Sequence, residues 1–98
     1  MTRYRISLLA EQDLEAIGDF IAQDNPYRAL TFIADLRKQC ARIAASPKAC
    51  RQRPELGDNI RSFAYGNYVI FFQDDPEEFC IVRVLHGAMD MESRFTEK

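Results

Sequence analysis

Apolar and polar residues follow two different periods along the 98-residue chain, helical in the first half and strand-like in the second. Between residues 10 and 23, Leu14, Ile17 and Ile21 recur at steps of three and four, with acidic residues between them. This spacing predicts an amphipathic helix. A second helix is predicted over residues 26–45, where apolar residues again alternate steps of four and three. Asn25 and Pro26 suit the N-cap and the first position of that helix.

The strand-like segments flank these helices. Residues 3–9 suit a short first strand, and residues 47–59, with two prolines and a glycine, have no period and predict a long loop. Three further strands are predicted over residues 60–64, 68–72 and 79–85, separated by turns at 65–67 and 73–78. The run 68–72 is apolar at successive positions, so that strand is buried on both faces or covered by a partner on one.

The order of these segments predicts an α+β fold of the order β-α-α-β-β-β. The turn between the two helices is short, which forces an antiparallel helical hairpin. Because each helix has one apolar stripe, the N-terminal hairpin is expected to pack on one face of an antiparallel sheet. We expect a single domain over residues 1–98, with residues 89–98 forming a flexible tail or a short helix.

Charge and cysteine content narrow the classes of function. Thirteen basic and fifteen acidic residues give a net charge of −2, whereas proteins that grip nucleic acid through phosphates usually carry a basic excess. This balance favours a protein partner. No apolar run approaches the ~18 residues needed to span a bilayer, and no secretory segment is recognisable, so we expect a cytoplasmic protein. Cys40, Cys50 and Cys80 lack Cys-x-x-Cys spacing, which predicts structural cysteines and no zinc site.

The only histidine, His86, lies in the stretch RVLHG together with Arg83. Residues three apart on a strand point to opposite faces, which disfavours Arg83 and His86 as a catalytic pair. A structural or capping role for His86 is the simpler interpretation, although histidine is also suited to proton transfer near neutral pH. The chain has no Gly-x-Ser-x-Gly elbow and no glycine-rich phosphate loop, so we expect no cofactor and no metal.

A basic cluster is predicted if the sheet brings the long loop and the strand ends together. Its members would be Lys48, Arg51, Arg53, Arg61 and Arg83. Such a cluster could stabilise a phosphate in an RNA-cleavage transition state, or it could hold the acidic stretch of a protein partner. Solvated arginines with one or two salt bridges are the third interpretation. The residues alone leave all three open.

Several of these segments resemble the ParE branch of the RelE/ParE toxin superfamily, the toxins of bacterial type II toxin–antitoxin modules. The resemblance covers residues 3–90 and includes GDNIRSFAYGNYVIFF and IVRVLHGAMD. Its most specific parts are Asp13-Leu14, Asn25-Pro26, Arg61 before Gly66-x-Tyr68, and the stretch from Arg83 to Gly87. Each is weak alone, but their order and spacing together are specific.

The resemblance implies a RelE-like α/β sandwich and a toxin that poisons DNA gyrase without catalysing a reaction. It also implies a ParD-like antitoxin of the ribbon-helix-helix type, which would form a hetero-oligomer with the toxin. The antitoxin is expected to dock along the helical hairpin groove and the sheet, or to add a strand at a sheet edge. The residues we expect to bind partners are Arg51, Arg53, Arg61, Tyr68 and Arg83.

The superfamily also implies an alternative, because RelE toxins cut mRNA on the ribosome. In that case the chain would be a metal-independent endoribonuclease, with Arg61 and Arg83 stabilising the phosphate and His86 acting as acid or base. A third hypothesis is an inactive relic that is retained for binding its antitoxin.

Overall fold

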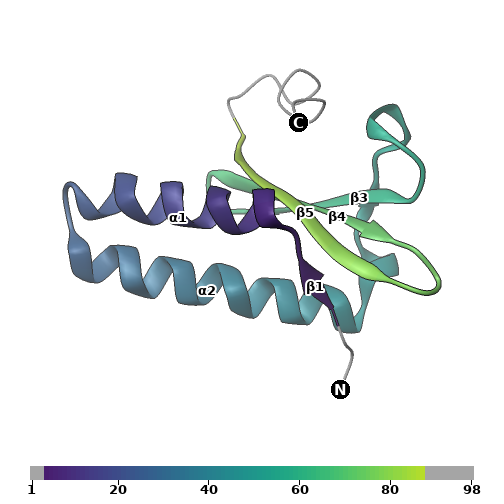
Figure 1. The fold of residues 1–98 in the computed structure, drawn as a ribbon, viewed down its shortest axis with the longest axis horizontal. Coiled ribbons are helices and arrows are strands. Elements are labelled where there is room, and N and C mark those ends of the chain that lie inside the picture. The colour runs from purple at the N-terminus through teal and green to yellow at the C-terminus, as the bar shows by residue number, and fades with distance from the viewer. Residues whose placement is uncertain (1–3, 88–98) are drawn as a thin grey trace.

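The structure is a computed structural model in which residues 4–87 are described, so the predicted tail over residues 89–98 lies outside the described part. Figure 1 shows two long antiparallel helices beside a twisted sheet. In chain order the elements are β1 (Arg5–Ile6), α1 (Leu8–Ala22), α2 (Pro26–Ala45), η1 (Pro47–Ala49), β2 (Arg51–Gln52), η2 (Pro54–Leu56), β3 (Ile60–Tyr65), β4 (Tyr68–Asp74) and β5 (Phe79–His86).

The strands form one sheet in the order β1-β5-β4-β3-β2. This arrangement confirms the predicted α+β fold with an N-terminal helical hairpin. The prediction of a wholly antiparallel sheet was wrong in one place: β1 pairs with β5 in parallel while the other neighbours are antiparallel, so the sheet is mixed. A parallel pair needs a long crossover between its strands, and the hairpin followed by β2, β3 and β4 supplies it.

Helix α1 begins earlier than the apolar period predicts. The Oγ of Ser7 accepts a hydrogen bond from the backbone N–H of Ala10 at 3.0 Å, so Ser7 is the N-cap and the helix starts at Leu8. This shortens the predicted first strand from residues 3–9 to Arg5–Ile6. The bounds predicted for α2 are confirmed, and Asn25 caps it by accepting from the N–H of Arg28 at 3.0 Å.

The prediction of an irregular loop over residues 47–59 was wrong in detail. The segment contains η1, β2 and η2, and β2 pairs with β3 through Arg51–Ser62 and Gln52–Arg61. A two-residue strand whose side chains are both exposed has no apolar alternation, so the sequence pattern carried no sign of it. Strands β3, β4 and β5 extend one or two residues beyond their predicted ends.

The core lies between the helical hairpin and one face of the sheet, called here the helix face. Leu14 of α1, Leu36 of α2, and Ile70, Phe72 and Val84 of the sheet have at most 1% of their surface exposed. The two helices approach closely at Gly18, where a Cβ would lie 3.4 Å from the Cγ1 of Ile33. A larger residue there would press the helices apart.

A bulge in β5 changes which residues share a face. Phe72 pairs with Ile81 and Phe71 pairs with Arg83, so Val82 is inserted without a partner on β4. Strict alternation along β5 would place Ile81 on the same face as Arg83 and Leu85, but the bulge prevents this. Ile81 instead joins Val84 in the core of the helix face. Beyond the bulge the alternation is regular, so Arg83 and His86 still belong to opposite faces.

The other face of the sheet is called here the second face, and its central residues are Ser62, Val69, Phe71, Arg83 and Leu85. Cross-strand pairing aligns Ser62, Phe71 and Arg83 in one row and places Val69 opposite Leu85 in the next. Phe71 is 0% exposed and Leu85 is 3% exposed, yet neither belongs to the cluster that packs under the helices. The central residues of β4 are therefore buried on both faces, which is the first of the two alternatives that its continuous apolar run left open.

The three cysteines are free thiols in different surroundings. Cys40 and Cys80 are buried, and Cys50 is partly exposed. Burial raises the pKa of the Cys40 thiol to about 11, and it raises the pKa of Cys50 and Cys80 as well. The reactive thiolate of Cys40 is therefore scarce at neutral pH.

We predict that a thiol reagent at pH 8 modifies Cys50 first, and that Cys40 reacts only as the protein unfolds. Mass spectrometry of digested samples taken over time measures the order of modification. Cys50→Ser should remove the fast phase and leave the slow one unchanged. A fast phase that persists in Cys50→Ser would contradict the burial described here.

Candidate functional site

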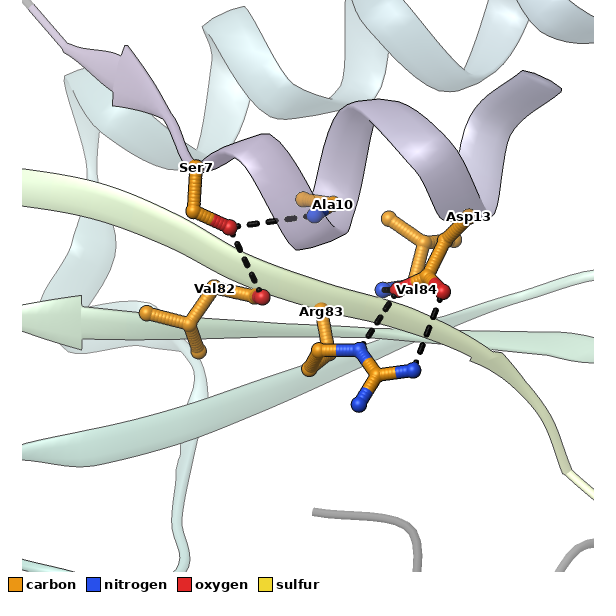
Figure 2. A network of polar contacts seen from close by, with 6 residues as sticks. All are labelled: Ser7, Ala10, Asp13, Val82, Arg83 and Val84. Carbon is orange, nitrogen blue, oxygen red and sulfur yellow. Dashed lines mark hydrogen bonds and ion pairs between the residues drawn. The ribbon is translucent and has the colours of Figure 1, made fainter. Parts of the chain in front are cut away.

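The outer edge of β5 is completed by side chains of α1 and its N-cap. Strand β1 covers β5 only opposite Cys80 and Ile81. Beyond that point the Ser7 N–H donates to the carbonyl of Ile81 at 2.9 Å, and the Ser7 Oγ donates to the carbonyl of Val82 at 3.0 Å. The Ser7 hydroxyl thus gives the Val82 carbonyl at the bulge a hydrogen-bond donor while it also caps α1, as Figure 2 shows.

Asp13, six residues after Ser7, continues this pattern from the second turn of α1. Its Oδ2 accepts from the backbone N–H of Val84 at 2.9 Å and from the Nε of Arg83 at 2.8 Å, while its Oδ1 accepts from the Nη2 of Arg83 at 3.0 Å. The side chains of Asp13 and Arg83 are 14% and 12% exposed. This bidentate, partly buried pair is of the strong, charge-assisted kind. We call Ser7, Asp13 and Arg83 the edge latch.

The edge latch gives Asp13, a carboxylate on the surface of α1, a partly buried partner on β5. Asp13 is the residue that sequence reasoning missed as a contact, although it lies beside the apolar stripe formed by Leu14 and Ile17. An acidic residue next to a buried stripe could have signalled a buried partner. That partner is Arg83, 70 residues away in sequence, and the spacing of apolar residues in α1 gives no information about it.

Arg51, Arg53 and Arg83 border the second face of the sheet. The guanidinium of Arg53 lies over the ring of Phe71 at 5.6 Å, donates to the Oγ of Ser62, and forms an ion pair with Glu55 at 2.7 Å. The hydrogen bond from Arg53 lowers the pKa of the Glu55 carboxyl, which favours its ionised form. Arg51 is exposed and pairs with Ser62 through the β2–β3 ladder.

Arg61 belongs to a different place. Its Nη1 donates to the carbonyl of Cys50 at 2.8 Å, and its Nε lies 3.7 Å from the Oδ2 of Asp74. With Lys48, Asp58 and Asn59, Arg61 lines a polar depression of about 410 Å³ at the end of the sheet nearest the loop. Two acidic residues, Asp58 and Asp74, lie in the same depression, so it is not purely basic.

His86 and Tyr68 pair across β4 and β5 on the helix face. Their rings meet edge to face at a centroid distance of 5.2 Å, and the Tyr68 ring also packs against Phe32 of α2 at 5.6 Å. Both line an apolar pocket of about 330 Å³ under α1, together with Ile17 and Phe20. The structural interpretation of His86 agrees with this packing.

The structure therefore does not bring the alternative catalytic residues Arg61, Arg83 and His86 to one point. Arg83 is on the second face, whereas Arg61 and His86 occupy helix-face positions. Arg61 pairs with Phe72 and His86 pairs with Tyr68, and these two partners lie four residues apart on β4. Four residues of strand span about 13 Å. A single phosphate could not touch all three side chains.

The helical hairpin presents an apolar groove of about 640 Å³ on its outer side. Gly18, Ala22, Leu30 and Ile33 line it, and Leu30 is 73% exposed. Its α1 wall is acidic, because Glu11, Glu15 and Asp19 also line the groove. An amphipathic partner helix with basic residues beside its apolar face would match this surface.

The family model for the ParE toxin of type II toxin–antitoxin systems, parDE, matches residues 4–91. The chain belongs to this family. A chain from the chromosomal ParDE toxin–antitoxin system of P. aeruginosa has a similar fold, with a TM-score of 0.72 and 21% identity, over 88% of this chain and 96% of that one. Comparison with curated protein sequences gives no match.

A structure of the toxin–antitoxin complex RelBE2 from Mycobacterium tuberculosis also has a similar fold, at a TM-score of 0.61 and 22% identity. The match covers 87% of this chain and 96% of that one. The resemblance to the RelE/ParE superfamily predicted from the sequence is therefore confirmed.

Two of the motifs that carried the ParE resemblance turn out to be halves of one contact. Asp13, from the Asp13-Leu14 motif, binds both Arg83 and the N–H of Val84, from the RVLHG motif. In this ParE toxin these motifs hold the hairpin on the sheet. No helix in residues 4–87 has the length and apolar character that crossing a bilayer requires.

We predict that Asp13→Ala destabilises the toxin by about 2–4 kcal/mol, because it leaves a partly buried guanidinium and a strand N–H without their acceptor. Urea denaturation followed by circular dichroism measures the change. Glu11→Ala is the matched control on the same helix. Glu11 also pairs with an arginine, Arg37, at 2.8 Å, but that pair is exposed and is expected to contribute roughly 0–1 kcal/mol. Equal losses in the two variants would refute a special role for Asp13.

Proposed function

We propose that this ParE toxin inhibits DNA gyrase by binding it, without catalytic turnover, and that a ParD-like antitoxin neutralises it. The membership in the ParE family of parDE systems is the observation that carries the proposal. A gyrase target implies that the protein acts in the cytoplasm. The partner-binding residues we propose are Arg51, Arg53, Arg61, Tyr68 and Arg83.

The state of the arginines supports binding in preference to catalysis. Arg53 is paired with Glu55, Arg61 with the Cys50 carbonyl and Asp74, and Arg83 with Asp13. Each guanidinium thus has a carboxylate beside it, at 2.7–2.8 Å for Arg53 and Arg83 and at 3.7 Å for Arg61, and that negative charge offsets part of the charge the guanidinium could offer to a phosphate. Stabilising a transition state depends on positive charge aimed at the developing negative charge, so neutralised arginines suit it less well.

The hairpin groove supports an antitoxin helix as the neutralising element. The groove is apolar at its floor and acidic along α1, and Glu15 and Asp19 form no ion pair with any residue between 4 and 87. A C-terminal antitoxin helix with leucine-like side chains and flanking lysines or arginines would bury Leu30 and neutralise that wall. This chemistry also agrees with the acidic net charge of the toxin.

The alternative function is a RelE-like endoribonuclease. The chain has a fold similar to a chain of the RelBE2 complex, and at 22% identity this similarity concerns the fold alone. The same fold thus serves both hypotheses, and only an assay of the target separates them.

We predict that the purified toxin blocks supercoiling of relaxed plasmid by gyrase, and that induction of the toxin in bacteria triggers the DNA damage response before translation falls. Gel assays of plasmid topology and primer extension on translated messages measure the two activities side by side. Adding the cognate antitoxin should restore supercoiling. Rapid cleavage of messages on the ribosome, with supercoiling unaffected, would replace the proposal with the nuclease alternative.

We also predict that His86→Ala retains toxicity, because the His86 ring serves packing against Tyr68 in an apolar pocket. Growth after induction measures the effect, and antitoxin binding together with circular dichroism confirms that the variant is folded. His86→Gln is the second variant, since it keeps a polar side chain at the strand end. If both folded variants lose toxicity, the imidazole itself is required and catalysis is supported.

A further inference from the structure

We infer that two copies of this toxin pair through the outer surface of the helical hairpin, with α1 of each copy lying against α2 of the other. This surface contains the hairpin groove and faces away from the core. Leu30 lines the groove and is 73% exposed, and Leu8, two helical turns before the groove residue Glu15, is 74% exposed. Large apolar side chains gathered on one exposed side of a helix pair are typical of a protein contact.

The two helices contribute opposite charges to this surface. On α1, Glu15 and Asp19 line the groove. On α2, Ala34 and Lys38 follow Leu30 at steps of four, so they continue along the same side of that helix. Glu15, Asp19 and Lys38 are exposed, and none of them forms an ion pair within residues 4–87. The basic, partly apolar helix that would match the acidic wall of the groove is therefore present in the chain itself.

Charge selects one of the two symmetric ways in which two such surfaces can pack face to face. A twofold axis across the helices puts α1 against α1, where the two acidic rows repel each other. A twofold axis parallel to the helices puts α1 of each copy against α2 of the other, so that acidic residues face basic ones. A contact of this second kind is self-complementary, as twofold contacts between identical chains must be.

The levels of the residues along the hairpin bring the opposite charges together. Within one copy, Gly18 of α1 lies against Ile33 of α2. Glu15 is three residues before Gly18, and because the helices are antiparallel it is level with the residue three positions after Ile33. Rotation about an axis parallel to the helices leaves these levels unchanged. Glu15 of one copy therefore comes within about 3 Å, measured along the axis, of the level of Lys38 of the other.

The apolar side chains fit the same arrangement. By the same levels, Leu30 of one copy comes opposite the part of the groove between Gly18 and Ala22 of the other. These residues are small, so they leave room for a leucine side chain. Leu8 comes close to Ala41, which is exposed on α2. Each large side chain thus meets small ones, as in ordinary helix packing.

The contact is small, which sets the strength expected of it. Helix α1 has 15 residues and is about 22 Å long, so a surface of this length and two helices in width is near the lower end of stable protein interfaces. We therefore expect a reversible dimer that forms as the concentration rises. An antitoxin helix in the groove would compete with the second copy for the surface around Leu30. The pairing itself depends neither on the antitoxin nor on the target.

Sedimentation equilibrium of the purified full-length toxin measures the association. The average mass should rise with concentration from that of one chain toward that of two. Glu15→Lys and Lys38→Glu should each weaken association by about tenfold or more, because the like-charge contact occurs twice in a symmetric dimer. An equimolar mixture of the two variants should recover the association of the unmodified toxin. In that mixed dimer one contact is native and the other is the same pair with its charges exchanged.

Arg42→Glu is the matched control for Lys38→Glu. It changes the net charge by the same amount and is also exposed on α2, but it lines a different depression, with Cys50 and Phe63. This variant should associate as the unmodified toxin does, and circular dichroism checks that every variant is folded. An equal loss of association in Arg42→Glu would indicate a general effect of net charge and would overturn the pairing.

Three further results would also overturn the proposal. A toxin that stays monomeric at every concentration would leave the outer hairpin surface to partners of other kinds. A dimer that survives both single charge reversals would be held together by another surface. Loss of the dimer in both variants, without recovery in their mixture, would contradict the packing of α1 against α2.

Discussion

The position of the helical hairpin on the sheet depends on the hydrogen bonds made by the backbone at the outer edge of β5. An uncovered strand edge leaves N–H and C=O groups without partners, and β1 is long enough to cover only two residues of β5. Ser7 and Asp13 provide the remaining hydrogen bonds from the start of α1. Ser7 caps the helix and binds the strand at the Val82 bulge, and Ser7 and Asp13 together fix where the hairpin lies on the sheet. The core between Leu14 and Val84 follows from that placement.

The edge latch also decides what Arg83 can do. Its guanidinium is partly buried and is oriented by two hydrogen bonds to a carboxylate, which fixes its position and offsets part of its charge. Arg53 is held by Glu55 at 2.7 Å, and Arg61 is held by the Cys50 carbonyl at 2.8 Å with Asp74 farther away at 3.7 Å. The toxin thus presents ordered charge on a folded frame, which suits recognition of a protein surface. The acidic hairpin groove and the arginine-bordered second face are two surfaces of different character on one small molecule.

Local signals in the sequence predicted the elements well, because each element has a local cause. Asn25 and Pro26 start α2, the three- and four-residue steps define its buried stripe, and the run from Tyr68 to Phe72 gives a strand buried on both sides. The features that were missed are those with causes distant in sequence. The bulge at Val82 and the Asp13–Arg83 pair require α1 and β5 to meet, and the parallel pairing of β1 depends on the crossover. The candidate site was predicted as one basic cluster, whereas the pairing register divides its arginines between two faces.

The most direct test of the edge latch is hydrogen exchange at the backbone amide of Val84, measured by NMR on the intact toxin. This amide lies on the edge of β5 that faces away from β4, and its acceptor is the Asp13 carboxylate. If the latch holds the hairpin in place, Val84 should exchange only by global unfolding, as slowly as the amides of the β4–β5 ladder. Exchange of Val84 as fast as that of an uncovered edge amide, in a protein whose β4–β5 amides remain protected, would contradict the account.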